Sequence, residues 1–327
     1  MRVLFIGGTG EISSSCVLSA TKAGHHVTVL NRGRTAQAST LGAEFVHGDI
    51  FSNAPYAGIA EREFDVVCQF LAFEPGAIAR DIEAFAGRCA QYIFISTASA
   101  YEKPTPRLPI TEETPTGNPY MAYSRNKAAC EVKLEEAFEA KRFPITIVRP
   151  SHTYRKRLPS TVIHGDHLAW RLLRGKKILV HGDGESLWTL THSDDFARAF
   201  IALFGRASAI GESFNITDDQ AQTWNHILNS VADAIGESAE ICPVSSRKLI
   251  SYAPEWEGPL LGDKSNSLVF NTRKLRNVIG DWRCEISLSQ GIKDAWLAVQ
   301  KRLVDGYQPD SDLDALIDRI LQDCGYE

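Results

Sequence analysis

The stretch "RVLFIGGTGEISSS", residues 2–15, decides the fold, because four apolar residues run directly into a turn with almost no side chains. Gly7, Gly10 and Ser13 occupy the three positions of a G-x-x-G-x-x-G turn between an apolar run and a helical pattern. Glycines let a backbone pass close to a diphosphate, and a helix N-terminus offers free N–H groups to it. Ser13 departs from the third glycine but is small enough for close packing of helix against strand. The stretch therefore predicts a dinucleotide-binding turn.

The run "HVTVLNRGR", residues 26–34, follows at the distance that a dinucleotide-binding fold requires of its second strand. An acidic residue at the end of that strand binds the ribose 2′-hydroxyl of NAD, whereas a nearby arginine accommodates the 2′-phosphate of NADP. This chain has Asn31, Arg32 and Arg34 there, which favours NADP. NAD stays open, because Asn31 can bind a ribose hydroxyl and Glu11 brings negative charge near the phosphates.

The first half of the chain alternates apolar runs with helical patterns. Runs at 3–6, 27–30, 44–47, 65–72, 92–96 and 145–150 enclose helical stretches at 10–22, 75–88 and 119–139. This alternation predicts an α/β fold with a doubly wound parallel (Rossmann) sheet. The pattern is broken after residue 150. We therefore expect a dinucleotide-binding domain of residues 1–150 plus about 188–217, and a smaller α/β substrate-capping domain of residues 151–187 and about 218–327.

Composition narrows the class of protein further. The net charge of −5 disfavours nucleic acid as a partner, and no apolar run reaches the ~20 residues of a membrane span. The seven cysteines are scattered without C-x-x-C spacing, so we expect reduced thiols and a cytoplasmic location. The nine histidines show no ligand spacing, so we expect no metal site.

The segment "AYSRNKAACE" contains Tyr123 and Lys127, four residues apart on one face of a predicted helix. An ammonium near a phenol lowers the tyrosine pKa from its ordinary value of ~10. Such a pair can exchange a proton with a substrate hydroxyl or carbonyl. A tyrosine and a lysine at this spacing are also common as a plain surface pair, so the pattern alone leaves both interpretations open.

Seven segments in order resemble the extended branch of the short-chain dehydrogenase/reductase superfamily, the NAD(P)-dependent epimerase/dehydratase-like proteins. They are "GGTGEIS" 7–13, "GDI" 48–50, "DVVCQFLA" 65–72, "STASAY" 96–101, "YSRNK" 123–127, "RPSHTY" 149–154 and "GDGESLWTLTHSDDFA" 182–197. The resemblance spans essentially the whole chain. It implies an NAD(P)-dependent epimerase or dehydrogenase, in which tyrosine deprotonates a substrate hydroxyl and hydride passes to nicotinamide C4.

The resemblance also implies roles for individual residues. Thr97 takes the place of the catalytic Ser/Thr beside Tyr123, and Lys127 also holds the nicotinamide ribose. Asp49 faces the adenine amine, although it can instead cap a turn. The expected cofactor-binding residues are Gly7, Thr9, Gly10, Glu11, Ile12, Asn31, Arg32, Arg34, Asp49, Ile50, Phe70, Leu71, Ala72, Lys127 and Pro150. The expected substrate contacts are Ser99, Ser151, His152, Arg155 and Trp188.

Three departures from the family pattern bear on the reaction. Ala98 and Ser99 stand where dehydratases carry Asp-Glu, so dehydration is not expected. Trp188 replaces an arginine that grips the diphosphate of nucleotide sugars, and His152 replaces an asparagine. We therefore expect a sugar, sugar acid or cyclic polyol without a UDP-type group. Trp188 can instead be simple packing. The basic run 155–157 is either a solvated loop or a site for an anionic substrate group.

Several alternatives stay open at this point. A ketone that leaves the enzyme makes the protein a dehydrogenase or carbonyl reductase with net redox, whereas a ketone that is reduced again makes it an epimerase. Plastid relatives with a similar "GGT" start are RNA-binding proteins, so a non-catalytic RNA-binding or cofactor-sensing protein is a third interpretation. The resemblance further implies a homodimer through the helices at about 75–88 and 119–139.

Overall fold

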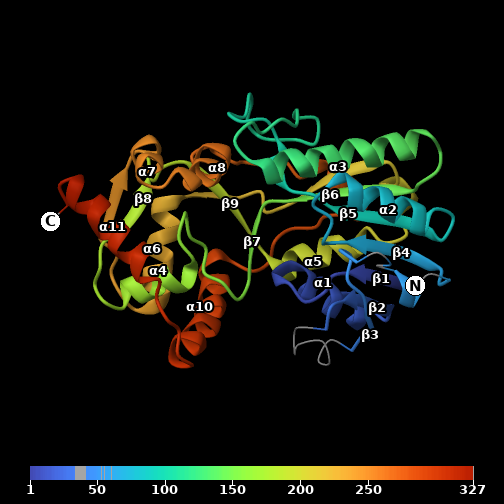
Figure 1. The fold of residues 1–327 in the computed structure, drawn as a ribbon, viewed down its shortest axis with the longest axis horizontal. Helices are drawn as coiled ribbons and strands as arrows, with labels where there is room; N and C mark the ends of the chain where they lie inside the picture. Colours follow the sequence, from blue (N-terminus) through green and yellow to red (C-terminus); the bar gives the residue numbers. More distant parts are fainter. Residues whose placement is uncertain (34–41, 53, 55, 60, 327) are drawn as a thin grey trace.

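The computed structural model describes residues 1–33, 42–52, 54, 56–59 and 61–326. Figure 1 shows two parts side by side, with the N-terminus in the part built around a large sheet and the C-terminus at the far end of the other. The residue Arg34 lies outside the described residues. None of the described helices is long and apolar enough to cross a membrane.

The first part contains a seven-stranded parallel sheet with the order β10-β6-β5-β4-β1-β2-β3, so the predicted doubly wound sheet is confirmed. Its strands are β1 (Arg2–Ile6), β2 (His26–Asn31), β3 (Glu44–His47), β4 (Phe64–Gln69), β5 (Cys89–Ile95), β6 (Ile145–Pro150) and β10 (Glu212–Ile216). Strand β1 pairs with both β2 and β4. The strand order reverses between β1 and β4, and ligands of such sheets bind outside the carboxyl ends of the strands at that point.

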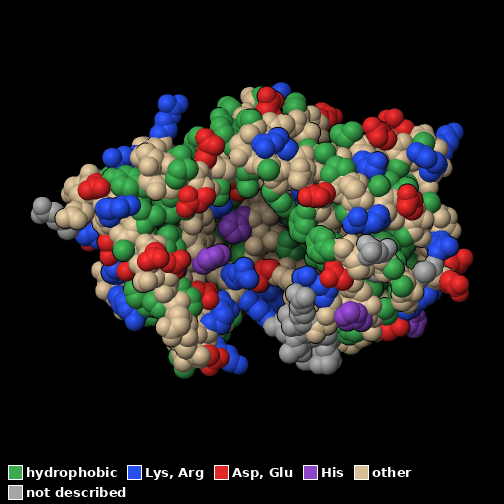
Figure 2. All heavy atoms as spheres, in the orientation of Figure 1, with side chains coloured by type: hydrophobic (Ala, Val, Ile, Leu, Met, Phe, Trp, Pro, Cys, Tyr) green, Lys and Arg blue, Asp and Glu red, His purple; other side chains and the backbone are tan. Residues whose placement is uncertain are grey.

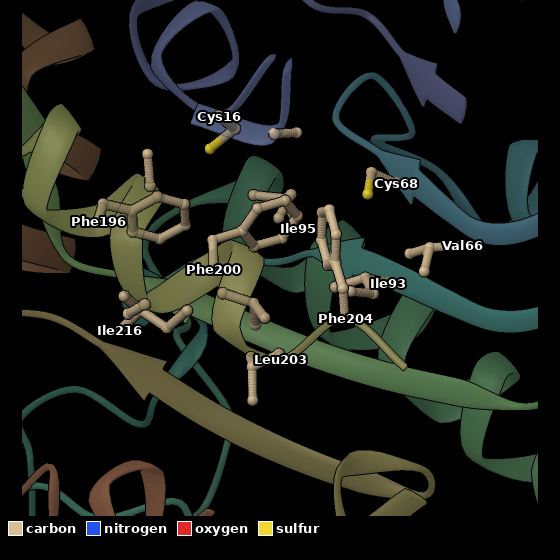
Figure 3. Packing of buried hydrophobic residues seen from close by; sticks show 14 of the residues in the cluster. Cys16, Val66, Cys68, Ile93, Ile95, Phe196, Phe200, Leu203, Phe204 and Ile216 are labelled. Atoms are coloured by element: carbon tan, nitrogen blue, oxygen red, sulfur yellow. The ribbon is translucent and has the colours of Figure 1, made fainter. Parts of the chain in front are cut away.

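Both faces of this sheet are buried under helices, which explains the continuous apolar runs. Helices α1 (Glu11–Lys22) and α5 (Ser193–Ala202) cover one face, and α2 (Pro75–Phe85) and α3 (Ala122–Glu139) cover the other. Successive β1 residues alternate between the two cores: Val3 and Phe5 join the α1/α5 core, whereas Leu4 and Ile6 join the α2/α3 core. Phe196, Phe200 and Phe204 fill the first core (Figure 3).

The second part has two small sheets and its own cores. The order β11-β9-β7 joins β7 (His152–Tyr154), β9 (Leu187–His192) and β11 (Ala221–Thr223), and β8 (Ile178–His181) pairs with β12 (Ile241–Val244). The helices of this part are α4 (Gly165–Leu172), α6 (Trp224–Ile235), α7 (Ser246–Tyr252), α8 (Glu257–Pro259), α10 (Leu288–Val304) and α11 (Ser311–Asp323). Helix α9 (Arg273–Ile279) instead packs on β10, and its Leu275 joins the α1/α5 core of the first part. Strand β9 therefore belongs to a small sheet, whereas α5, directly after it, packs on α1.

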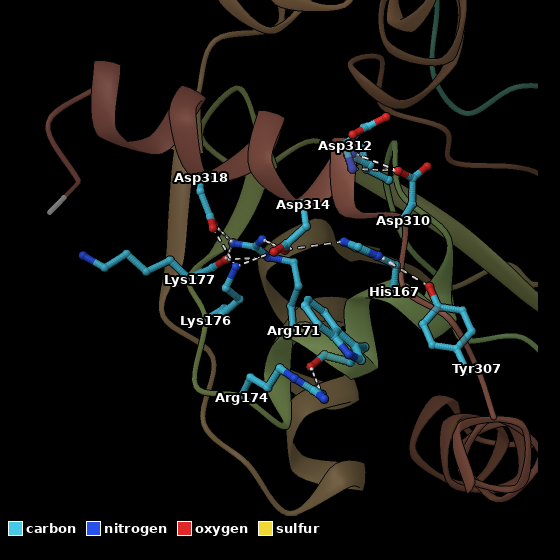
Figure 4. A network of polar contacts seen from close by, with 12 residues as sticks. His167, Arg171, Arg174, Lys176, Lys177, Tyr307, Asp310, Asp312, Asp314 and Asp318 are labelled. Carbon is cyan, nitrogen blue, oxygen red and sulfur yellow. Dashed lines mark hydrogen bonds and ion pairs between the residues drawn. The ribbon is translucent and has the colours of Figure 1, made fainter. Parts of the chain in front are cut away.

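The C-terminal helix α11 is held by an ion-pair cluster (Figure 4). Arg171 of α4, only 1% exposed, donates to Asp314 and Asp318 of α11. Lys176 pairs with the same two carboxylates at 2.5 and 2.6 Å. The apolar stripe of α11 turns the other way, into a core with α7 and β12. Ion pairs thus hold one face of α11, and apolar contacts hold the other.

Candidate active site

The glycine-rich turn leaves room for backbone only. Gly7 has φ +82°, and a Cβ there would lie 2.8 Å from Cγ of Leu71. A Cβ on Gly8 would lie 2.7 Å from Cγ1 of Val29. Gly10 is the N-cap of α1, and its N–H donates to Oγ of Ser13 at 2.9 Å. The serine in the third position is accommodated because its hydroxyl serves the turn itself.

A cavity of about 470 Å³ opens on this turn, at the carboxyl ends of β1, β2 and β4. Asn31, at the end of β2, accepts the N–H of Gly33 through Oδ1, and its buried Nδ2 has no hydrogen-bond partner among the described residues. This donor suits a ribose oxygen, and the turn suits a diphosphate, so the residues fit a dinucleotide. The cavity lining contains these predicted cofactor-binding residues: Gly7, Thr9, Gly10, Glu11, Ile12, Asn31, Arg32, Asp49, Ile50, Phe70 and Leu71.

Asp49 and Glu11 have structural partners as well. Oδ1 of Asp49 accepts the N–H of Phe51 at 3.0 Å, which is the turn-capping role that the sequence left open. The carboxylate of Glu11 accepts the backbone N–H of Lys156 from the second part of the molecule. Both carboxylates are therefore oriented by the protein at the edge of the cavity.

A buried carboxylate that the sequence did not single out supports the cavity from below. Asp81 of α2 accepts hydrogen bonds from Nε2 of Gln69, at 2.6 Å, and from the hydroxyls of Tyr56 and Tyr92. Burial raises the pKa of Asp81. Oε1 of Gln69 in turn accepts the N–H groups of Leu71 and Ala72, so this network orients the loop that lines the cavity.

A second cavity, of about 230 Å³, brings together the predicted reactive side chains. Of the predicted residues it is lined by Thr97, Ser99, Tyr123, Pro150, Ser151, His152 and Trp188. Thr97 follows β5 and caps the short helix η3 (Ala98–Ala100), where its Oγ1 accepts the N–H of Ser99 at 3.2 Å. Tyr123 stands in the first turn of α3, half-exposed. A strand end and a helix start thus present two hydroxyls to one space.

Lys127 is not among the residues that line this cavity. Lys127 is 1% exposed, and its ammonium donates to the carbonyls of Ala72 at 2.8 Å and Ile95 at 2.7 Å. It also lies 4.7 and 4.6 Å from the ring centroids of Phe73 and Phe94. Burial lowers the pKa of Lys127 to about 8.

The expectation that Lys127 lowers the pKa of Tyr123 is wrong in this structure. Burial raises the pKa of Tyr123 and the charge of Asp263 raises it further, against a hydrogen bond with Thr97 that lowers it. The ammonium of Lys127 is instead held by two backbone carbonyls and lies over two aromatic rings. At neutral pH the phenol therefore keeps its proton.

His152 and Trp188 form one unit of the cavity wall. Nε1 of Trp188 donates to Nδ1 of His152 at 3.1 Å, and the indole packs on Trp224 with centroids 5.2 Å apart. Burial, aided by Lys264, lowers the pKa of His152 to about 3. The imidazole is thus neutral and carries its proton on Nε2, as a donor. Trp188 combines the packing role with a place on the cavity wall.

Arg155 does not line the reaction cavity. Its Nη1 donates to Oγ of Ser14 at 3.3 Å, and its Nε lies 3.4 Å from Asp194. It lines a third cavity, of about 660 Å³, together with Lys156, Arg157 and the N-terminus of α1. Figure 2 shows the surface hollowed between the two parts, with Lys, Arg and His side chains along the hollow. A role in holding the two parts together accounts for the contacts of Arg155.

Sequence reasoning missed several lining residues. Phe73 lines the dinucleotide cavity, and its ring centroid lies 6.0 Å from that of Tyr123. The reaction cavity also includes Met121, Asp263, Lys264 and Leu268. Three of these come from the segment 252–268, which has no apolar periodicity to reveal its path. Phe73 comes directly after the predicted strand 65–72, whose end has the expected cofactor contacts, and this position was a usable signal.

Comparison with known proteins gives concordant results. Residues 3–217 match the model of the NAD dependent epimerase/dehydratase family. The chloroplast stem-loop binding protein of 41 kDa b of Arabidopsis thaliana is 25% identical, over 90% of this chain and 78% of that protein. The 2'-dehydrokanamycin reductase of Streptomyces kanamyceticus is 24% identical, over 80% of this chain and 72% of that protein.

Solved structures share the fold at low sequence identity. An epimerase from Methanothermobacter thermautotrophicus superposes with a TM-score of 0.78 at 17% identity, over 93% of each chain. UDP-glucuronic acid 4-epimerase from Bacillus cereus, solved with UDP-glucuronic acid and NAD, gives 0.74 at 19%, over 92% of this chain and all (100%) of that one. The glycine turn, the parallel sheet and the family model lead to one conclusion: the chain belongs to the NAD dependent epimerase/dehydratase family.

Proposed function

We propose that this protein is an NAD(P)-dependent oxidoreductase or epimerase that interconverts a hydroxyl and a carbonyl on a sugar-like or polyol substrate. The observation that carries the proposal is the position of Phe73. Its ring lines the dinucleotide cavity and also contacts Tyr123, which lines the reaction cavity. The space for a dinucleotide and the reaction cavity therefore approach each other at the rings of Phe73 and Tyr123.

The roles of the residues follow from their positions. A bound nicotinamide supplies hydride chemistry. Tyr123 holds or receives the proton of the substrate oxygen, and the Thr97 hydroxyl binds the same oxygen. Lys127 orients the loop at Ala72 and the end of β5 through its two hydrogen bonds. In the proposal it therefore acts by placing the loop and the strand end.

The raised pKa of Tyr123 supports a protonated resting phenol. A protonated phenol donates to a carbonyl oxygen, which suits the reducing direction or the second half of an epimerisation. Water elimination finds no support, because Ala98 and Ser99 replace the acid–base pair of dehydratases and Oγ of Ser99 is engaged with Oγ of Ser124 at 2.7 Å. The proposal therefore excludes dehydration.

The preferred cofactor in this proposal is NADP. Arg32 lines the cavity beside Asn31. The described residues that follow β2, Arg32 and Gly33, include no carboxylate of the kind that binds the ribose 2′-hydroxyl of NAD. Arg34, the second basic residue of the prediction, lies outside the described residues. Tighter binding of NADH than of NADPH, measured by the fluorescence of the reduced nicotinamide, would contradict this preference.

The experiment that tests the reaction uses the purified protein with NAD or NADP and a panel of sugars, sugar acids, cyclic polyols and their ketones. A change in absorbance at 340 nm indicates net redox, and inverted stereochemistry without such a change indicates epimerisation. Tyr123→Phe should abolish either signal while it leaves dinucleotide binding intact. Equal turnover by Tyr123→Phe, or no turnover of any member by a protein with bound dinucleotide, would contradict the proposal.

Binding of RNA is the second candidate, favoured by the similarity to the chloroplast stem-loop binding protein. The net charge of −5 counts against it, because sequence-independent binding to phosphates requires clustered positive charge. Salt-sensitive RNA binding that persists in Tyr123→Phe, without turnover, would establish this candidate in place of the first.

The proposal includes a homodimer in a reducing compartment such as the cytoplasm. Val132 and Phe138 are exposed apolar residues of α3, the helix that the family resemblance assigns to dimer contact. All seven cysteines are free thiols. A monomer in multi-angle light scattering at micromolar concentration would refute the dimer.

A further inference from the structure

The reaction cavity contains an acidic residue on an unusual backbone turn. Asp263 belongs to the π-helical turn η6 (Leu260–Lys264), directly after α8. Turns of this kind are rare in proteins, and those that occur often lie at functional sites. Nδ2 of the buried Asn118 donates to the carbonyl of Gly262 at 2.6 Å and to that of Ser99 at 2.8 Å. The turn that carries Asp263 is thereby fixed to the segment that carries Thr97 and Ser99.

Two ammonium groups flank Asp263. Nζ of Lys264 lies 3.5 Å from Oδ2 of Asp263, and the Asp263 side chain is 18% exposed. Lys103 is 3% exposed, and its Nζ has no hydrogen-bond partner among the described residues. Burial lowers the pKa of Lys103 to about 8, whereas the charge of Asp263 acts to raise it. Burial also raises the pKa of Asp263, against the charges of Lys264 and Lys103, which act to lower it. The carboxylate of Asp263 and the buried ammonium of Lys103 therefore each favour the charged form of the other.

The polar side chains that line the reaction cavity differ in charge and in their ability to donate hydrogen bonds. Among the described lining residues, Asp263 is the single carboxylate, and Lys264 is the single charged base because His152 is neutral. Tyr123, Thr97 and His152 can each donate a hydrogen bond, whereas Oγ of Ser151 already donates to the carbonyl of Thr189 at 2.7 Å. The hydroxyl of Thr97, the Asp263–Lys264 pair and the imidazole of His152 therefore share this cavity with Tyr123. The charge of Asp263 acts on both Tyr123 and Lys103, and Lys127 lies four residues after Tyr123 on the same helix.

We propose that Asp263 is a substrate-binding residue: its carboxylate accepts a hydrogen bond from the substrate hydroxyl next to the one that exchanges its proton with Tyr123. The inference rests on the proposed function and names its substrate class, a neutral polyol or sugar with hydroxyls on adjacent carbons. Asp263 and Tyr123 line the same cavity of only about 230 Å³, which suits contacts with neighbouring hydroxyls of one small substrate. A substrate carboxylate at the same position would be repelled by the negative charge of Asp263. Lys264 would not offset this repulsion, because it is already paired with Asp263.

Two variants and two readouts test this inference without any need for turnover. Asp263→Asn keeps the shape and removes the charge, and Glu257→Gln removes an exposed carboxylate from the same segment as the control. The first readout is the phenol titration of Tyr123, taken as the absorbance at 295 nm of each protein minus that of its Tyr123→Phe counterpart. We expect a lower pKa of Tyr123 in Asp263→Asn, because a nearby negative charge is gone, and no change in Glu257→Gln.

The second readout is ligand-observed NMR with the dinucleotide-loaded protein and myo-inositol, D-glucose and D-glucuronate as probes. Asp263→Asn should weaken binding of the two neutral probes about tenfold, since a charge-assisted hydrogen bond is lost, and should reduce the preference over glucuronate. If Asp263→Asn is poorly folded because Lys103 loses its anion, the double variant Lys103→Met/Asp263→Asn removes both charges, and the same weakening is expected.

Unchanged titration of Tyr123 together with unchanged probe binding in Asp263→Asn would overturn the inference. So would a wild-type protein that binds glucuronate but neither neutral probe, or none of the three. These outcomes are separate from failure of the proposed function, which is judged by turnover and by Tyr123→Phe. A protein that binds the neutral probes through Asp263 but turns nothing over supports this inference and refutes catalysis.

Discussion

The indole Nε1 of Trp188 donates a hydrogen bond of 3.1 Å to Nδ1 of His152, so one of the two ring nitrogens of this histidine is always an acceptor. The bond joins β9 to β7 and keeps the imidazole neutral on the wall of the reaction cavity. It also makes the histidine a source of pH-dependent stability.

His152 should lower stability in acid. Its pKa is about 3 in the folded protein and about 6.5 when unfolded, so the unfolded chain binds an additional proton as the pH falls below 6.5. The free energy of unfolding should therefore fall by about 2 kcal/mol between pH 7 and pH 5 on account of this group. Urea unfolding should show a shallower loss for His152→Asn than for wild type. The exposed His226→Asn is the control, and equal losses in all three proteins would contradict the prediction.

Lys127→Met should weaken dinucleotide binding. The substitution leaves the carbonyls of Ala72 and Ile95 without their buried donor and releases the loop beside Leu71. We expect the dissociation constant of NADPH to rise about tenfold, equivalent to about 1.4 kcal/mol. Fluorescence titration measures it, with Lys133→Met on the same helix as the control. An unchanged constant would show that the lysine does not position this loop.

Gly7→Ala should destabilise the protein and close the dinucleotide cavity. Its φ of +82° is unfavourable for alanine, and the new Cβ would lie 2.8 Å from Cγ of Leu71. The expected loss is about 1–2 kcal/mol, seen as a lower Tm. Gly76→Ala is the matched control, because a Cβ there meets nothing within 4 Å. A Tm for Gly7→Ala at or above that of the control would be the contrary result.

Arg171→Met should loosen the C-terminal helix. Removing the buried guanidinium takes away one cation from Asp314, which is 14% exposed, and leaves it with Lys176 and the imidazole of His167. The expected cost is about 3 kcal/mol. Lys176→Met removes a more exposed partner of the same carboxylates and should cost less. Urea unfolding compares the two variants, and equal costs would mean that burial of Arg171 has no special weight in the cluster of Figure 4.

The strands of the first half of the chain could be predicted from the sequence because they are buried on both faces. In β1 and β4 nearly every residue is apolar, and such runs separated by helical patterns are typical of a parallel sheet covered by helices. Strand β9 was harder to place, because a single apolar run does not reveal which sheet it joins. Its partners are β7 and β11, distant in sequence, and tertiary packing alone selects them.

The candidate site was predicted in outline and not in its electrostatics. Spacing four apart places Tyr123 and Lys127 on one helix face, but it does not specify that Phe73 and Phe94 enclose the ammonium. Nor does it reveal Asp263, because η6 has no apolar period and its path depends on packing of Leu260 and Trp256 into a remote core. Contacts of this kind reside in the three-dimensional arrangement and leave no local pattern.

The loop 155–157 ties the two parts together at one particular place, through the bond of Lys156 to Glu11 and the contacts of Arg155 with Ser14 and Asp194. That place is the first turn of α1, the same helix end that is suited to a diphosphate. Any hinge motion that widens the gap between the parts has to break bonds at this helix end. If the protein binds a dinucleotide as proposed, an opening of this kind would therefore disturb the helix turn that receives it.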